Sequence, residues 1–216
     1  MPAYYPISLN LTGRPCLVVG GGSVAARKTA SLLEAGAKVT VVAPDIGPPL
    51  DEMAAAGLVV LRRRPFDRSD LEGCDLVVAA TDDPAVNQTV STEARGRRVL
   101  VNVVDDPERS DYIVPAVVRR GALCLAVTTD GYSPALAKRI RDRLASEFGP
   151  EYGQFLDWLG ETREKIKREE PDETRRKALF EALVDSNVLA KLRDGRAKAA
   201  RDEFDRLLRE RPRSDQ

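Results

Sequence analysis

Cys16-Leu17-Val18-Val19-Gly20-Gly21-Gly22-Ser23-Val24-Ala25 decides the fold of this chain of 216 residues. Its first four residues form an apolar run that predicts a β-strand, and apolar residues at helical spacing follow over 25–35. A G-x-G-x-x-G/A run between a strand and a helix is typical of a turn that binds a dinucleotide. A plain strand-to-helix turn, as in many α/β proteins, is the alternative interpretation.

The residues of this turn have separate predicted tasks at the phosphates of a dinucleotide. Gly20 makes the tight turn, and Gly22 lets the backbone approach the pyrophosphate. Ser23 and Val24 begin the helix, whose free N–H groups are offered to the phosphates, and Ala25 keeps the helix close to the sheet. We therefore predict that Gly20, Gly22, Ser23 and Val24 bind the cofactor.

Short apolar runs alternate with helical patterns from residue 15 to about 113. The runs lie at 16–19, 39–43, 58–61, 76–80 and 99–103. Runs rich in Val and Leu without polar alternation are typical of a parallel sheet that is covered on both faces. The sequence therefore predicts an α/β fold with a Rossmann-like, doubly wound parallel sheet.

The pattern changes after residue 113. Apolar runs at 113–118 and 122–128, separated by Arg119-Arg120-Gly121, predict two strands joined as a hairpin. Ser133 and Pro134 then supply an N-cap and a first-turn proline for a helix that runs to about residue 147. Charged segments with apolar residues at helical spacing follow, at 152–168, 173–186 and 196–209.

These patterns divide the chain into three parts. We predict an NAD-binding Rossmann-like domain at 1–113, a strand-strand-helix unit for dimerisation and substrate binding at 114–149, and a helical domain at 150–216. The middle unit is too small to hold a core of its own, which fits a place at a subunit interface.

The charged residues are balanced, and histidine is absent. Lys plus Arg equals Asp plus Glu at 34 each, so no overall field attracts nucleic acid or a membrane. The absence of histidine excludes a Ser-His-Asp or Cys-His arrangement and any histidine-ligated metal site. Acid–base chemistry must therefore use carboxylates, Lys, Tyr or Cys, and we predict no bound metal.

Neither a secretory signal nor a membrane span is expected from the sequence. No apolar stretch approaches the roughly 18 residues of a span, so a cytoplasmic location is the expectation. The three cysteines, Cys16, Cys74 and Cys124, lie within or beside apolar runs, and we interpret them as buried small hydrophobic residues.

Ligands of an open parallel sheet bind beyond the carboxyl ends of the strands. Pro44 and Asp45 follow the second predicted strand, where an acid usually binds the ribose, although Asp45 stands two residues later than usual. No arginine is near them in the sequence to take a 2′-phosphate, which favours NAD over NADP. Thr81 and Asp82 follow the fourth strand and either line the cofactor or belong to the cap of the next helix.

Asn102 and Asp105 end the fifth predicted strand, near the expected nicotinamide. With no histidine present, Asp105 is the best candidate for a proton acceptor. The alternative is that Asp105 and Asp106 are turn residues before Pro107.

A polar loop at 128–134 contains Thr129, and basic residues flank it. Arg119, Arg120 and Lys138 are able to bind carboxylates of a strongly acidic substrate. Otherwise they are part of a solvated surface.

Together these residues closely resemble the precorrin-2 dehydrogenase family, which includes the N-terminal part of siroheme synthase. The motifs that carry the resemblance are 17–28, 39–44, 79–83, 101–105 and Ser133-Pro134, in order and at matching intervals. The resemblance covers residues 5 to about 150, and beyond that only length and helical character agree.

The resemblance implies oxidation of precorrin-2 to sirohydrochlorin with NAD⁺, a step toward siroheme or cobalamin, by a homodimer. It gives Asp105 a role in dehydrogenation and, in bifunctional members, in the ferrochelatase step that inserts Fe²⁺. It also places Thr129 near the tetrapyrrole, whose carboxylates give the basic residues a purpose.

Two other functions stay open. The first is an NAD-sensing regulatory dimer without catalysis, although such modules usually place an acid directly at the end of the second strand, where Ala43-Pro44 stands here. The second is a generic NAD(P) oxidoreductase for a small molecule, which leaves the polar loop and the basic residues unexplained.

Overall fold

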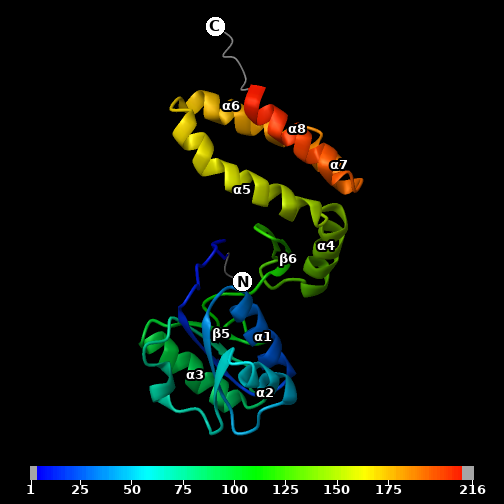
Figure 1. Ribbon diagram of the computed structural model, residues 1–216. Helices are drawn as coiled ribbons and strands as arrows, with labels where there is room; N and C mark the ends of the chain where they lie inside the picture. Colours follow the sequence, from blue (N-terminus) through cyan, green and yellow to red (C-terminus); the bar gives the residue numbers. More distant parts are fainter. Residues whose placement is uncertain (1–3, 211–216) are drawn as a thin grey trace. The chain divides into compact units, whose positions relative to one another are not determined.

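Five parallel strands form a sheet in the order β3-β2-β1-β4-β5, with β1 at its centre (Figure 1). Their bounds are β1 Pro15–Val19, β2 Lys38–Val42, β3 Val59–Arg62, β4 Leu76–Ala79 and β5 Leu100–Val103. The chain builds the sheet outward from β1 to β3 and then returns to the other side of β1. This topology confirms the predicted doubly wound α/β fold.

The structure is a computed structural model that describes residues 4–210. Contacts divide the chain into two compact units, Met1–Val114 and Pro115–Gln216, and the five-stranded sheet belongs to the first. The separation of a middle unit from a helical domain within the second stays a prediction. Residues 211–216 of the predicted helical domain lie outside the described range.

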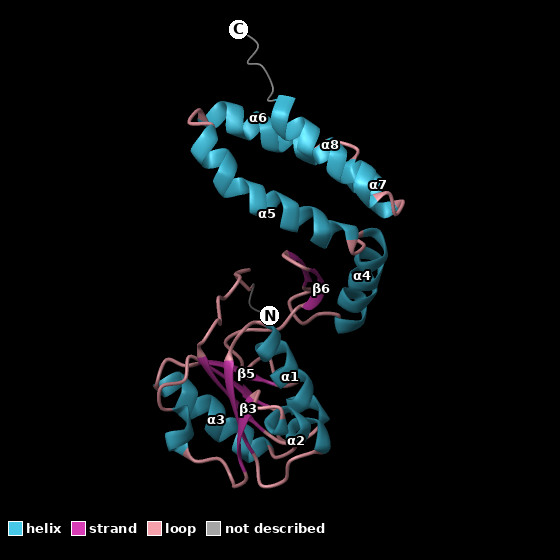
Figure 2. Ribbon diagram, viewed as in Figure 1, coloured by secondary structure: helices cyan, strands magenta, loops and turns pink. Residues whose placement is uncertain are grey.

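Helices cover both faces of the sheet because neighbouring residues of each strand point to opposite faces. Figure 2 shows α1 (Ser23–Glu34) and α2 (Pro48–Ala55) on one side of the strands and α3 (Pro84–Gly96) on the other. Cys16 and Val18 of β1 pack in the core under α1 and α2, and Leu17 and Val19 pack in the core under α3. A short 3₁₀ helix, η1 (Arg68–Leu71), joins β3 to β4.

The second unit begins with an antiparallel hairpin of β6 (Ala116–Arg120) and β7 (Leu123–Val127). The predicted hairpin is therefore present, but the predicted turn is wrong in one respect. Arg119 and Arg120 pair with β7 as strand residues, and the connection is made by Gly121, whose φ of 56° suits a tight turn, and Ala122. The helix α4 (Pro134–Glu147) follows with the predicted cap, since the Ser133 hydroxyl accepts the Leu136 N–H at 3.2 Å.

Four helices complete the second unit. They are α5 (Glu151–Glu169), α6 (Glu173–Val184), α7 (Val188–Arg193) and α8 (Ala197–Glu210). Their core is centred on the fully buried Phe204, whose ring lies edge-on to Phe155 at 6.2 Å and 5.6 Å from the ring of Trp158. Within residues 4–210, no helix combines the length and apolar character needed to cross a bilayer.

The cysteines differ in burial more than the sequence predicts. Cys16 is buried and Cys74 partly so, but Cys124 is exposed, because it lies on the outward face of β7 between the half-buried Leu123 and Leu125. The interpretation of Cys124 as a buried residue is therefore wrong for this chain.

Candidate functional site

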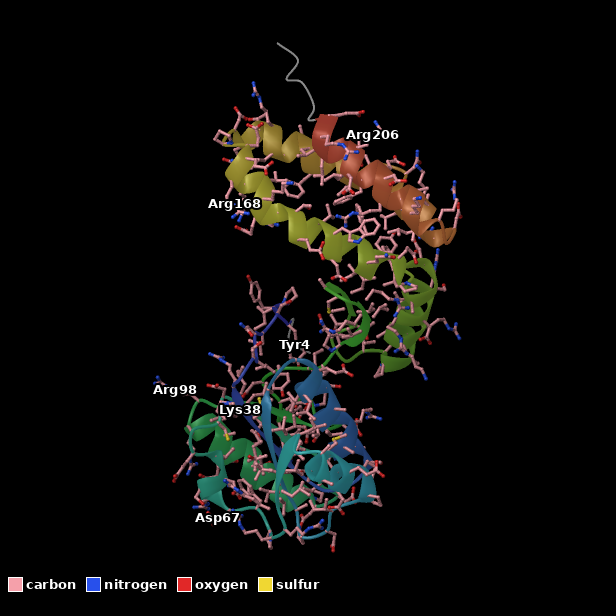
Figure 3. The ribbon with its side chains drawn as sticks, in the orientation of Figure 1. Tyr4, Lys38, Asp67, Arg98, Arg168 and Arg206 are labelled. Atoms are coloured by element: carbon pink, nitrogen blue, oxygen red, sulfur yellow. The ribbon has the colours of Figure 1, made fainter. Side chains whose placement is uncertain are left out.

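A pocket of about 700 Å³ lies at the carboxyl ends of β1, β2 and β4, a size within the usual range of small-molecule sites. It is lined by all but one of the residues predicted to bind the cofactor: Gly20, Gly22, Ser23, Val24, Pro44, Asp45, Thr81 and Asp82. Figure 3 shows Lys38, at the amino end of β2, and Asp67, beyond the carboxyl end of β3, at opposite ends of this unit. The pocket lies at the carboxyl end, as the topology predicts.

The glycine turn is shaped by two backbone contacts that leave no room for side chains. Gly20 has a φ of 128°, and a Cβ there would lie 2.3 Å from the carbonyl oxygen of Ala80. A Cβ on Gly21 would lie 1.8 Å from the carbonyl oxygen of Asp45, and the Gly21 carbonyl accepts the Gly47 N–H at 2.9 Å. Gly21 is therefore required where the loop after β2 meets the turn, a role that sequence reasoning missed.

The amino end of α1 opens into this pocket. Its N-cap is Gly22, and no described atom lies within 4 Å of where a Cβ on Gly22 would be, so the approach to the backbone is free. The first N–H groups of a helix have no partner within it, and the helix dipole favours negative charge there. Ala25 is fully buried and holds the helix against the sheet. The arrangement fits the pyrophosphate of a dinucleotide.

Thr81 and Asp82 line the pocket next to a well-defined helix cap. Asp83 accepts the N–H groups of Ala85 at 2.8 Å and Val86 at 3.3 Å, which starts α3. The Thr81 hydroxyl lies 2.8 Å from the side-chain oxygen of Asn87, which orients it. The cap of α3 is therefore present, made by Asp83, while the predicted contact of Thr81 and Asp82 with the cofactor stays a prediction.

Residues after β3 form the wall beside Asp45. Pro65 and the half-buried Phe66 line the pocket together with Ile46. An apolar ring at this place suits a flat base. No motif in the sequence pointed to Phe66, because its nearness to Asp45 depends on β3 pairing with β2.

The same pairing brings an arginine to the strand end next to β2, although none is near Asp45 in the sequence. Arg62 lies opposite Val42 in the sheet, and its carbonyl accepts the Ala43 N–H at 3.2 Å. The sequence placed this arginine far from Asp45, but the strand order places it at the next strand end.

Asn102 is the predicted cofactor residue that does not line the pocket. It is 6% exposed, and its side-chain N–H donates to the carbonyl of Tyr112 at 3.0 Å. Its side-chain oxygen has no hydrogen-bond partner within the described part of the chain. The structure therefore places Asn102 inside the fold, at the strand that leads to Asp105.

Asp105 is exposed and occupies the turn directly after β5, with a φ of 59°. The turn closes when Asp106 N–H donates to the Val103 carbonyl at 3.2 Å. Burial is the main cause that lowers the pKa of Lys28 on α1, and the Asp105 carboxylate acts in the opposite direction. The interpretation as a turn residue is therefore correct for the backbone, and the carboxylate has no hydrogen-bond or ion-pair partner within the described residues 4–210.

Comparison with known proteins places this arrangement in a family. Three family models match in succession: Putative NAD(P)-binding at 7–116, Sirohaem biosynthesis protein central at 120–147, and Sirohaem synthase dimerisation region at 151–208. The solved structure of SirC, precorrin-2 dehydrogenase, is 33% identical, has a TM-score of 0.78, and is matched over 94% of this chain and 100% of its own. The chain belongs to the precorrin-2 dehydrogenase family.

Longer relatives contain the same family region. Siroheme synthase of Methylococcus capsulatus is 40% identical over 197 residues, which is 91% of this chain and 42% of that protein. Siroheme synthase of Escherichia coli is 39% identical over 208 residues, 96% of this chain and 46% of that protein. The chain thus spans less than half the length of these curated relatives. None of these relatives is a regulatory protein, so the alternative of an NAD-sensing dimer has no support.

The residues predicted to bind substrate all lie in the second unit of this family member. The Arg120 guanidinium donates to the carbonyls of Phe148 and Ala145, each at 3.0 Å, and so caps the end of α4. The Thr129 hydroxyl accepts the Ser133 N–H at 3.0 Å, just before that helix. Arg119 and Lys138 are exposed. Arg120 thus has a structural task, and the predicted role of these residues in substrate binding stays a prediction.

Among the side chains of residues 4–210, no group of three or more Asp, Glu or Cys residues is arranged to hold an ion.

Proposed function

We propose that this chain oxidises precorrin-2 to sirohydrochlorin with NAD⁺, as a cytoplasmic homodimer in tetrapyrrole biosynthesis. The observation that carries the proposal is the match over the whole length of SirC, precorrin-2 dehydrogenase, in a chain whose pocket has the glycine turn of a dinucleotide site. The longer siroheme synthases support the same pathway.

The pocket would hold NAD⁺ through backbone and carboxylate groups. The N–H groups at the start of α1 would bind the pyrophosphate, and Gly22 leaves the space that this approach needs. The Asp45 carboxylate would accept hydrogen bonds from the hydroxyl groups of the ribose. Thr81 and Asp82 would border the cofactor on the other side. When bound, the nicotinamide supplies the two-electron oxidant of the reaction.

Asp105 would remove the proton that the oxidation releases from the substrate. Its carboxylate is exposed in the turn that follows the carboxyl end of β5, and it interacts electrostatically with Lys28 on α1. The neighbouring Asp106 is engaged instead by Arg109, which donates from its backbone N–H at 3.1 Å and forms an ion pair. Of the two, only Asp105 is available as a base.

The second unit would supply the dimer contacts and bind the substrate carboxylates. The sequence predicts dimerisation through 114–149, whereas the family model of the sirohaem synthase dimerisation region matches 151–208. We therefore extend the proposed interface to the helices that follow 149. Arg119 and Lys138 have exposed cationic groups for the acidic edge of a tetrapyrrole, and the Thr129 hydroxyl is near the start of the same helix.

Anaerobic turnover with precorrin-2 and NAD⁺ tests the proposal. We expect NADH absorbance and the sirohydrochlorin spectrum to grow together. In Asp105→Asn, the rate should fall by about 100-fold or more, the usual contribution of a general base, while NAD⁺ binds as before. The matched control is Asp106→Asn, which should keep most of the activity.

A wild-type chain that binds NAD⁺ but never reduces it with precorrin-2 would refute the dehydrogenase. Fe²⁺ added after the oxidation is complete tests for ferrochelatase activity against an enzyme-free control.

A further inference from the structure

Three consecutive arginines lie at the end of β3: Arg62 is its last residue, and Arg63 and Arg64 follow it. Arg62 pairs in register with Val42, and Pro65 and Phe66, which follow the arginines, line the pocket. Arginine next to the ribose is typical of sites that bind the 2′-phosphate of NADP. A guanidinium group without a partner at this strand end would favour a 2′-phosphate, so the partners of the three arginines matter for the choice of dinucleotide.

Two of the three share one buried carboxylate as their ion-pair partner. Arg64 donates to both oxygens of Asp70, at 2.7 and 2.6 Å, and Arg62 donates to one of them at 2.5 Å. The Asp70 side chain has no exposed surface, and it also accepts the Asp67 N–H at 2.9 Å. The carboxylate is fully engaged, so it fixes both guanidinium groups to η1.

Arg63 directly follows β3 and has a different partner. Its guanidinium forms an ion pair with Asp51 in the first turn of α2. That turn begins at Gly47, which lines the pocket. The two side chains are 52% and 45% exposed, so water screens this pair far more than the pair at Asp70. Removal of the Asp51 charge would therefore free Arg63, which stands two residues before Pro65 of the pocket lining.

The pocket itself adds a negative charge at the same place. Asp45 is exposed, lines the pocket, and forms no side-chain hydrogen bond or ion pair with any residue of the described range 4–210. A phosphate monoester carries a charge of about −1.5 to −2 at neutral pH. The Asp45 carboxylate repels such a group, whereas it accepts a hydrogen bond from a free hydroxyl.

We propose that Asp51 is a positioning residue for cofactor choice: it holds Arg63 in an ion pair, and with Asp70 holding the other two arginines the site takes a ribose with a free 2′-hydroxyl and rejects a 2′-phosphate. The inference rests on the proposed function only in that a nicotinamide dinucleotide binds this pocket.

Calorimetric titration with 5′-AMP and 2′,5′-ADP tests the inference, because the two probes differ only in the 2′-phosphate. The wild-type chain should bind 5′-AMP more tightly. In Asp51→Asn, affinity for 2′,5′-ADP should rise about tenfold, the worth of one charge-assisted contact, with 5′-AMP unchanged. The double variant Asp51→Asn/Arg63→Gln should return to the wild-type preference.

Glu52→Gln is the matched control. It removes the same charge from the next residue of α2, and its side chain has no hydrogen-bond or ion-pair partner in the described part of the chain. Circular dichroism should show all variants folded, since the Asp51 pair is largely exposed.

Two results would overturn the inference and leave the pocket's function intact. One is a wild-type chain that binds 2′,5′-ADP more tightly than 5′-AMP. The other is an Asp51→Asn variant whose affinity for 2′,5′-ADP rises no more than that of Glu52→Gln. If the wild-type chain binds neither probe nor NAD⁺, the proposed function itself fails, and the inference fails with it.

Discussion

Replacement of Asp70 by Asn should destabilise the first unit in a way that depends on pH. The carboxylate has no exposed surface. Burial acts to raise its pKa, but hydrogen bonds from Arg64, the Asp67 backbone and Arg62 lower it from 3.8 to about 2. The difference, at about 1.4 kcal/mol for each pH unit, corresponds to about 2 kcal/mol of stability at neutral pH. The two arginines are partly exposed and regain water in the variant, so the loss should not greatly exceed this value.

The direction of this pH dependence follows from the lowered pKa of Asp70. Asp70 stabilises the fold fully above about pH 4, where the unfolded carboxyl group is ionised, and loses its effect as the pH falls toward 2. The gap in unfolding free energy between wild type and Asp70→Asn should therefore be about 2 kcal/mol at pH 7 and shrink between pH 4 and pH 2.

Urea unfolding, monitored by hydrogen exchange in peptides that cover β1 to β5, measures this gap. Fluorescence does not serve, because the single tryptophan, Trp158, lies in the second unit. Glu72→Gln is the control, since Glu72 is exposed and directly follows η1. A gap that stays constant from pH 7 to pH 2, or that is absent at pH 7, would refute the reasoning.

Three further tests address the glycine turn of the pocket and the hydrophobic cores of the first and second units. Gly21→Ala should weaken NAD⁺ binding at least tenfold in calorimetry, because the new Cβ would lie 1.8 Å from a backbone oxygen, whereas Gly22→Ala has open space and should fold normally. Phe204→Ala should destabilise the second unit by about 3–5 kcal/mol in urea unfolding read from tryptophan fluorescence; a loss below 1 kcal/mol would contradict the packing described. Cys16 should resist iodoacetamide at pH 8 until the chain is unfolded, since burial is the main cause that raises its pKa to about 11, and mass spectrometry of its peptide would detect early labelling if this were wrong.

The sheet was predictable because burial on both faces leaves a simple mark in the sequence. A strand such as β1 is apolar at nearly every position, and each of the five runs corresponds to a strand within one or two residues. The helices α2 and α7 escaped prediction for the opposite reason. They have eight and six residues, and α2 buries only Leu50, so neither presents a periodic apolar stripe long enough to recognise.

The site was predictable where a motif lies within one strand and its turn, and not where strand pairing creates it. The turn at Gly20 and the start of α1 at Ser23 follow from local sequence. Phe66 joins Asp45 in the pocket lining, and Arg62 lies opposite Val42, only because β3 pairs with β2, and no short motif encodes that pairing. Asn102 shows a further limit: its place at a strand end suggested a ligand, but its side chain turns inward to Tyr112.

The central position of β1 has a consequence for synthesis on the ribosome. One edge of β1 pairs with β2 soon after both emerge, whereas the other edge must wait for β4, which begins at Leu76. The face of β1 that α3 covers waits longer still, until residues 84–96 are made. A nascent chain that ends between β3 and β4 therefore carries an open apolar strand edge, the kind of surface that chaperones bind and that joins growing chains into aggregates. The order of the strands makes this interval unavoidable, and the speed of translation through residues 63–96 sets how long it lasts.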